Sequence, residues 1–244
     1  NYDALLIGWN TQTLKPNVTF FGGSSNYCNA AAARANMIAS DNWAITDGGN
    51  DCSKATKAAN THFVTTWKTD NPGTSNSTSI TIPTTGSGYS YDVDWDNDGR
   101  MDEFGITGDI THDFGTAGTK TIRIQGSFPR IYFNNSGDKS KILSVEQWGA
   151  NAWTSMAYAF YGANNLVINA SDTPSLSNVT DMTRMFHSAT SLGGGTGNWS
   201  WDTSTINTIN SLFYGASTFN KNINSWDTSS ITDMRGAFAY ASLY

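Results

Sequence analysis

Apolar side chains in the second half of the chain recur with a nearly constant period. Phenylalanines are spaced by 26, 27 and 25 residues, at Phe160, Phe186, Phe213 and Phe238. Four positions before each of them stands another apolar side chain, at Met156, Met182, Ile209 and Met234. The sequence Trp-Asp-Thr-Ser also occurs twice, starting at Trp201 and at Trp226. Anchors that repeat in the same phase indicate an internal repeat over residues 153–244.

The spacing inside one repeat predicts a short helix followed by an extended segment. In residues 179–189, apolar side chains fall three or four positions apart, which places them on one face of a helix. In residues 219–229 they alternate roughly with polar ones, as in a strand. One such repeat cannot bury its apolar face alone, so we expect stacked repeats that form a helix–strand solenoid. The side chains expected in its core are Met156, Phe160, Met182, Phe186, Phe213, Trp226, Met234 and Phe238.

The pattern changes in the first half of the chain. Residues 1–50 predict a helix, a strand, a second helix and a second strand, and residues 51–61 have the polar composition of a linker. Short β-branched and aromatic runs between turn-forming residues predict a β-sandwich of immunoglobulin-like type over residues 62–127. Residues 128–152 are then a transition that caps the start of the repeats at residue 153.

Composition narrows the class of function. Charged residues make up 14% of the 244 residues, and 20 acidic against 14 basic side chains give a net charge of −6. An acidic chain without a basic cluster is a poor nucleic-acid binder. No apolar run is long enough to cross a membrane, so no membrane insertion is expected in this segment. The low charge and high aromatic content suit a β-rich protein that works outside a cell.

An acidic loop carries the most specific candidate chemistry. Eight of the 20 acidic residues lie between positions 92 and 113. Alternating carboxylates at Asp94, Asp96 and Asp98, followed by Gly99 and Asp102, resemble the opening of a calcium-binding loop. We therefore predict a calcium site made by these four aspartates and the backbone oxygen of Arg100. The alternative is a solvated acidic loop that binds nothing tightly.

Cysteine content and known catalytic motifs add two expectations. Cys28 and Cys52 are the only cysteines, and an extracellular setting favours a disulfide between them over two unrelated buried thiols. The sequence contains no nucleophile elbow, phosphate-binding loop, dinucleotide fingerprint or zinc-protease motif. The pair His112–Asp113 lies in a predicted strand, where a structural role is expected, and His187 is expected at the surface. We therefore predict no catalysis.

The repeat sequence resembles a known family. The segment LFYGASTFNKNINSWDTSSITDM, residues 212–234, resembles the BspA-like leucine-rich repeats of bacterial surface proteins. The resemblance covers about residues 153–244, and residues 1–50 resemble the cap that closes such an array. The segments YDVDWDNDG and THDFGTAGTKTIRI resemble a PKD-like domain over about residues 63–126. Together these resemblances imply a mixed α and β fold, with leucine-rich-repeat-like solenoid segments flanking a PKD-like β-sandwich.

The resemblance implies a secreted or cell-surface protein of a bacterium. We expect a non-enzymatic modular repeat protein for adhesion or protein–protein interaction, with a host or matrix protein or a glycan as partner. One alternative is a structural unit of an extracellular filament or stalk, in which neighbouring copies or units of the same chain pack end to end. Another is a glycan-binding module of a secreted hydrolase. Its ligand platform would be formed by Trp199, Trp201, Tyr214 and Trp226, unless these tryptophans are buried.

Overall fold

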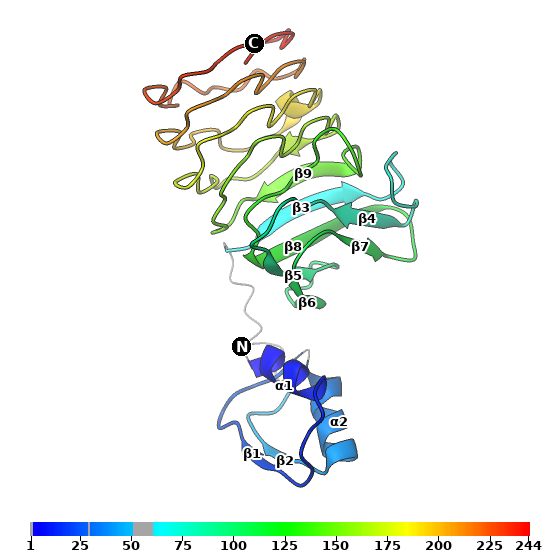
Figure 1. Cartoon of the computed structure of the whole chain (residues 1–244). Coiled ribbons are helices and arrows are strands. Elements are labelled where there is room, and N and C mark those ends of the chain that lie inside the picture. Colours follow the sequence, from blue (N-terminus) through cyan, green and yellow to red (C-terminus); the bar gives the residue numbers. More distant parts are fainter. Residues whose placement is uncertain (1, 29, 51–60) are drawn as a thin grey trace. The chain divides into compact units, whose positions relative to one another are not determined.

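A computed structural model describes residues 2–28, 30–50 and 61–244, and it separates the chain into two compact units (Figure 1). The first unit combines Asn1–Lys57 with Asp98–Phe104, and the second combines Ala58–Asn97 with Gly105–Tyr244. Most of the predicted linker 51–61 therefore lies outside the described residues. Residues 98–104 comprise the end of a loop between two strands of the larger unit and the start of the second of these strands, and they are described with those strands. Each unit is considered by itself.

The N-terminal unit has the helix, strand, helix, strand order that its sequence predicts. Its elements are α1 (Tyr2–Asn10), β1 (Thr19–Phe21), α2 (Ala31–Asp41) and β2 (Ala44–Thr46). The two strands run parallel, with Thr19 opposite Ala44. The helices bury a small cluster in which Leu6, Ala30 and Met37 are fully enclosed. The Asp3 carboxylate accepts hydrogen bonds from the backbone N–H groups of Cys28 and Ala30, just before α2 begins.

The larger unit is built on β-sheet. Its strands are β3 (Phe63–Lys68), β4 (Ser79–Ile82), β5 (Ser90–Asp94), β6 (Glu103–Ile106), β7 (Ile110–Asp113), β8 (Thr119–Ser127), β9 (Ile142–Gln147) and β10 (Val167–Ile168). Six of them form one sheet in the order β10-β9-β3-β8-β5-β6, and β4 pairs with β7 in a second sheet. Strand β3 lies inside the large sheet, which explains why most of its side chains on both faces are buried.

A self-contained immunoglobulin-like sandwich over residues 62–127 is not what the structure shows. Strand β9, from the predicted transition segment, pairs antiparallel with β3, and β10 extends the same sheet in parallel orientation. The two edges of β3 are therefore completed by β8 on one side and β9 on the other. Sheet and repeats share one continuous core, in which Trp67, Trp148 and Phe160 are all fully buried. The hydrophobic core therefore continues across residue 128, where the sequence predicted the end of the sandwich.

A buried charged pair fastens a long loop to this sheet. Lys141 and Asp138 are both almost completely enclosed. The Lys141 ammonium donates to the backbone oxygens of Ser75, Asn76 and Ser79, while Asp138 accepts from the backbone N–H groups of Thr74, Ser75 and Thr81. Burial lowers the pKa of Lys141, and the nearby Asp138 carboxylate opposes that shift. A buried charge is tolerated when hydrogen bonds replace its contacts with water, as they do for both of these side chains.

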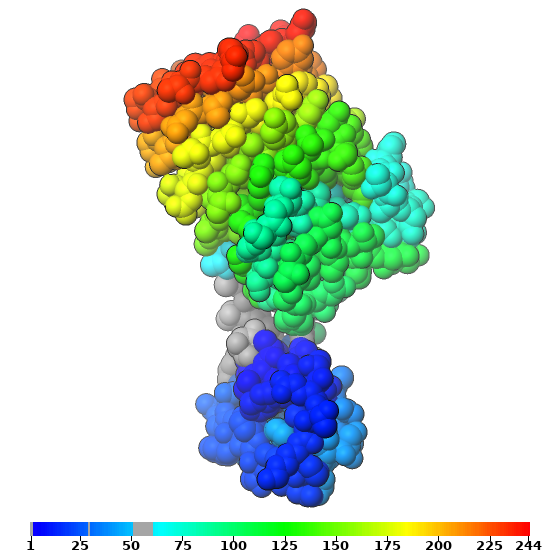
Figure 2. Space-filling model, viewed as in Figure 1, coloured from blue at the N-terminus to red at the C-terminus, as the bar shows by residue number. Residues whose placement is uncertain are grey.

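Residues 153–244 form a stack of turns, and the predicted helix–strand solenoid is wrong. Apart from β10 and the short 3-10 helix η2 (Leu192–Gly194), this segment contains no helix or strand. The backbone N–H of Met182 donates to the oxygen of Thr208, in the following repeat, and Ile209 donates likewise to Asp233. In Figure 2 the repeats appear as successive coloured bands from green to red. Every second backbone N–H thus donates to a carbonyl oxygen of the following repeat. These N–H groups therefore cannot make the hydrogen bonds within the segment that an α-helix needs.

Burial of the repeating side chains largely agrees with the sequence pattern. Phe160, Phe186 and Phe213 are fully buried, and their rings stack with centroid distances of 5.7 and 5.8 Å. Phe238 continues this row but is only partly buried. The prediction is wrong for Met234, which is 45% exposed. The correct phase was therefore recognised in the sequence, although the backbone conformation was not.

In the part of the chain that the structure describes, no helix has both the length and the apolar character needed to cross a membrane.

Candidate binding surface

The tryptophans considered as a ligand platform lie in the core. Trp199, Trp201 and Trp226 are 4%, 1% and 9% exposed. Trp201 stacks on Trp226 at 5.6 Å, and the indole N–H of Trp226 donates to the backbone oxygen of Trp199. These side chains present no open ring face for a ligand. Of the four predicted platform residues, only Tyr214 reaches the surface, where it belongs to a different aromatic cluster.

That cluster is a line of rings on the outside of the stacked turns, which we call the outer aromatic stripe. Its members are Tyr132, Tyr158, Tyr161, His187, Tyr214 and Tyr240. Neighbouring ring centroids are 4.5 Å apart from Tyr161 to His187, 4.6 Å from His187 to Tyr214 and 5.0 Å from Tyr214 to Tyr240. Five of the rings are half-buried, and Tyr240 is 74% exposed. The stripe therefore extends across successive turns.

Two arginines lie at the end of the stripe nearest the sheet. The Arg130 guanidinium carbon is 4.7 Å from the ring centre of Tyr132, and that of Arg184 is 5.8 Å from the ring centre of Tyr158. Both distances are in the range of cation–π contacts. Burial lowers the pKa of His187, and the positive charge of Arg184 lowers it further. His187 is therefore favoured in its neutral form between the two tyrosine rings.

The backbone at the stripe adopts a conformation that side chains other than glycine rarely take. Tyr158, Arg184 and Tyr240 have φ angles of 60°, 54° and 60°. This left-handed region costs free energy for bulky residues and is accepted where the surrounding structure enforces it. At Tyr158 and Arg184 the bonds between turns enforce it, because their N–H groups donate to Thr183 and Asn210 in the following turn. The backbone that carries the Tyr158 ring and the Arg184 side chain is therefore tied to the next turn.

A sequence signal for the stripe was present. Tyr161, His187 and Tyr214 each directly follow one of the phased phenylalanines, so an aromatic ring repeats at the next position as well. In a helix, adjacent positions diverge by about 100°, so a helical interpretation does not place this second series on the same face as the phenylalanines. In the actual turns, the phenylalanine points into the core and the following ring lies outside.

The structure brings together three of the four predicted calcium-binding aspartates. Carboxylate oxygens of Asp94, Asp96 and Asp102 all lie within 4.8 Å of one another. Asp94 is buried and also lies 3.7 Å from the Arg123 guanidinium, whereas Asp96 and Asp102 are exposed. Three oxygen donors of this kind fit a hard cation such as calcium. The Arg123 guanidinium partly neutralises the Asp94 carboxylate.

The fourth predicted aspartate of that site, Asp98, is placed differently. The Asp98 carboxylate is outside the group of three and accepts a hydrogen bond of 2.8 Å from the backbone N–H of Arg100. The Arg100 side chain lies 3.7 Å from the same carboxylate. Asp98 therefore supports the turn of the loop in this conformation, and the calcium site stays a prediction.

The predicted disulfide involves Cys52, which lies outside the described residues. The structure describes only Cys28 of the two cysteines and contains no free cysteine among the described residues, so the Cys28–Cys52 bridge stays a prediction.

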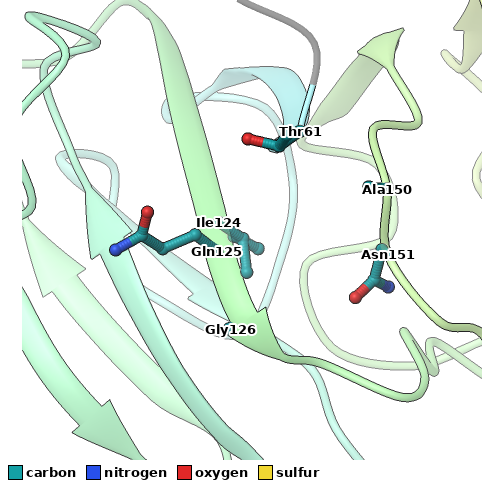
Figure 3. A pocket seen from close by; sticks show the side chains of 6 residues that line it. All are labelled: Thr61, Ile124, Gln125, Gly126, Ala150 and Asn151. Atoms are coloured by element: carbon teal, nitrogen blue, oxygen red, sulfur yellow. The ribbon is translucent and has the colours of Figure 1, made fainter. Parts of the chain in front are cut away.

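A pocket of about 330 Å³ lies beside β8, and its lining residues are Thr61, Ile124, Gln125, Gly126, Ala150 and Asn151 (Figure 3). Its polar side chains already have partners. Gln125 points away from Ala150 and Asn151, and it contacts His62 and Asp92. The Asn151 amide donates to the backbone oxygen of Phe128. The lining contains no ionisable side chain, so this pocket provides no titrating acid or base.

Comparison with known proteins gives one family match. Residues 130–244 match a family described as "Mycoplasma protein of unknown function, DUF285". The match covers slightly less than half of the 244 residues. No curated protein matches the chain, and no solved structure does.

The family resemblances drawn from the sequence are corrected by these findings. The match over the repeats is to a family of unknown function, and the described turns contain no leucine-rich helix–strand repeat. The match begins at residue 130 and so gives no support to a PKD-like domain over residues 63–126. Residues 1–50 likewise have no support as the closing cap of a leucine-rich array. The fold is predominantly β, with two α-helices among the described residues, both in the N-terminal unit.

Proposed function

We propose that this protein is a non-enzymatic binding module of a secreted or cell-surface protein, which contacts another protein through the outer aromatic stripe. The observation that carries the proposal is the stripe itself: a row of six rings, each in contact with the next, on the outside of the stacked turns. Tyrosine and arginine are enriched at the centres of protein interfaces, where rigid rings contribute large contact areas at low entropic cost.

The arrangement of the rings favours a protein partner over a glycan. His187 and Tyr214 stack with an interplanar angle of 21°, so each covers a face of the other. A sugar ring that stacks on an aromatic side chain needs an open face, and the tryptophans that could have offered one are buried. Ring edges, phenol hydroxyls and the two arginines are the groups that the stripe offers. These groups suit the mixed apolar and polar surface of a protein.

The test is binding of the whole protein to a panel of purified extracellular-matrix proteins and to a glycan array. A variant that carries both Tyr161→Ala and Tyr214→Ala is expected to bind the protein ligand at least about tenfold more weakly, because central aromatic residues dominate interface energies. Thr180→Ala, at an exposed position of the same turns outside the stripe, is the matched control and is expected to bind normally.

Two results would contradict the proposal. Wild-type affinity in the double variant would place the binding surface elsewhere on the molecule. Binding to glycans alone, with loss in the double variant, would support the glycan-binding alternative instead. Thermal unfolding of each variant checks that a loss of binding does not come from a loss of fold.

A further inference from the structure

Positively charged side chains gather at the end of the outer aromatic stripe nearest the sheet, and we call them the basic cluster. Its members are Arg130, Lys139 and Arg184. Arg184 is exposed, and the other two are partly exposed. They are separated in the sequence, so they form no basic run there. The fold thus creates a local positive surface on a chain whose net charge is −6.

Both arginines of the cluster converge on Tyr158. The Arg130 Nη2 group donates to the backbone oxygen of Ala157, directly before Tyr158, at 2.9 Å. Arg184 reaches the Tyr158 ring from the following turn, with its guanidinium carbon 5.8 Å from the ring centre. The two positive charges therefore approach one tyrosine from neighbouring segments of the fold.

Lys139 extends the cluster toward Tyr161. Its ammonium group donates to the side-chain oxygen of Asn135, whose backbone N–H donates to the oxygen of Tyr161 at 2.9 Å. A Cβ atom on Gly162 would lie 2.9 Å from the Lys139 Cδ atom, so the lysine stem runs along the backbone that directly follows Tyr161. The amide of Asn135 carries no charge, so this hydrogen bond does not neutralise the lysine.

The two arginines of the cluster differ from the other arginines of the chain. Each of the others has a carboxylate at 2.8–3.7 Å, and these paired residues are Arg34, Arg100, Arg123 and Arg235. Arg130 and Arg184 form no ion pair with any carboxylate among the residues that the structure describes. Their contacts are tyrosine rings and a backbone oxygen, which leave the positive charge uncompensated.

The carboxylates closest to the cluster in the sequence have other partners. Asp138, directly before Lys139, is buried and accepts from backbone N–H groups of the long loop described above. Asp181 accepts from the backbone N–H of Thr183 at 2.7 Å. The cluster therefore offers its charges to a group from outside the chain.

We propose that the basic cluster binds an acidic segment of the protein partner, whose carboxylates pair with the cluster while the rest of the contact follows the stripe. The inference rests on the proposed function, because the cluster is the sheet-proximal end of the same surface. A planar guanidinium binds a carboxylate through two parallel hydrogen bonds, and contact with a ring reduces the freedom that its side chain loses on binding. Complementary charge then selects the partner and fixes its register.

The size of the cluster favours an acidic protein segment over a long polyanion. A nucleic acid or a sulfated glycan carries closely repeated charges along its whole length, and it needs many cations to bind. This chain has a net charge of −6, so most of a long polyanion would meet a surface of like charge. A few carboxylates on a protein match the few cations of the cluster.

The test is fluorescence anisotropy of the whole protein with two labelled synthetic peptides. One alternates tyrosine with glutamate, and in the other every glutamate is replaced by glutamine. The wild type is expected to bind the acidic peptide at least about tenfold more tightly than the neutral one. The double variant Lys139→Gln/Arg184→Gln is expected to lose that preference and to bind the neutral peptide like the wild type. Arg235→Gln is the matched control, since it removes a guanidinium that already has a carboxylate partner.

A conservative variant separates charge from fold. Arg184→Lys keeps the positive charge at the same position and is expected to retain more of the preference than Arg184→Gln. Its affinity is expected to fall below that of the wild type, because an ammonium cannot form the two parallel bonds of a guanidinium. Thermal unfolding shows whether each variant is as stable as the wild type.

The possible outcomes distinguish this inference from the proposed function. If the acidic peptide binds no better than the neutral one, or neither binds, the acidic-segment proposal is overturned. Equal binding of both peptides that Tyr161→Ala/Tyr214→Ala abolishes would do so while leaving the stripe as the binding surface. Loss of the preference in Lys139→Gln/Arg184→Gln, with normal binding in the tyrosine variant, would support the cluster and contradict the stripe. Heparin that binds more tightly than the acidic peptide, and only when the cluster is intact, would overturn the choice of a protein partner.

Discussion

His187 occupies the position in its turn that tyrosine occupies in the turns before and after it. Its imidazole lies between the rings of Tyr161 and Tyr214, and it donates to or accepts from the Ser188 hydroxyl at 2.9 Å. Burial and the nearby Arg184 both lower its pKa. A neutral ring therefore stacks without penalty, while a protonated one meets a like charge and loses hydration.

Stability is consequently expected to depend on pH through this residue. In the unfolded chain, histidine has a pKa of about 6.5, and in the folded protein the pKa of His187 is lower. When the pH falls below about 6.5, the unfolded chain takes up the proton first, so the free energy of unfolding decreases. The decrease ends once the pH is below the folded pKa. Chemical denaturation at pH values above and below these two pKa values measures the decrease in the free energy of unfolding.

His187→Tyr restores the residue found at the equivalent position of the neighbouring turns and removes the titration. The difference in unfolding free energy between this variant and the wild type is expected to grow in favour of the variant as the pH falls. A difference that is the same at neutral and acidic pH would show that His187 is not responsible. Because all other titrating groups are shared, the comparison isolates this one side chain.

At the scale of elements, the stacked turns explain why a helix was expected. Apolar spacings of three and four residues are also produced by consecutive tight turns, in which the N–H of Met185 donates to Met182 and that of Ala189 to Phe186. A helix would direct every N–H back along its own axis. Here the intervening N–H groups bond to the following repeat, and left-handed residues such as Arg184 and Ser211 prevent helix propagation.

The loop between β5 and β6 offers a second test at this scale. Calcium that binds only the folded loop stabilises it, by about 2.7 kcal/mol at a concentration 100 times the Kd. Addition of calcium to chelator-treated protein is therefore expected to raise the melting temperature, and Asp96→Asn is expected to abolish the increase because it removes one of three converging carboxylates. Asp202→Asn, an exposed aspartate on the stacked turns, should respond like the wild type. An unchanged melting temperature in wild-type protein would favour the solvated loop.

At the scale of the molecule, the described apolar side chains form two separate buried clusters. One surrounds Leu6 and Met37 in the N-terminal unit, and the other runs continuously from Phe63 in the sheet to Ala237 near the end of the stack. Separate cores unfold as separate cooperative units when little packing energy links them.

Calorimetry is therefore expected to resolve two unfolding transitions. Leu6→Ala should cost the smaller unit about 2–5 kcal/mol and shift only its transition. Phe213→Ala should cost about 3–5 kcal/mol and shift only the other, because its fully buried ring packs on Phe186 and Phe219. A single transition that both variants shift equally would show one cooperative unit.

The sequence by itself determined the repeat, its phase and most of its core. Side-chain burial depends on hydrophobicity and spacing, both of which are visible in the chain, so Phe160, Phe186 and Phe213 could be assigned correctly. The convergence of Asp94, Asp96 and Asp102 could also be anticipated, because they are close in sequence. The tertiary structure alone decided the conformation of the repeats, the entry of β9 and β10 into the sheet, and the exposure of the outer aromatic stripe. Each of these depends on hydrogen bonds or ring contacts between residues about one repeat apart, and local spacing does not say whether an N–H bonds within its own turn or to the next one.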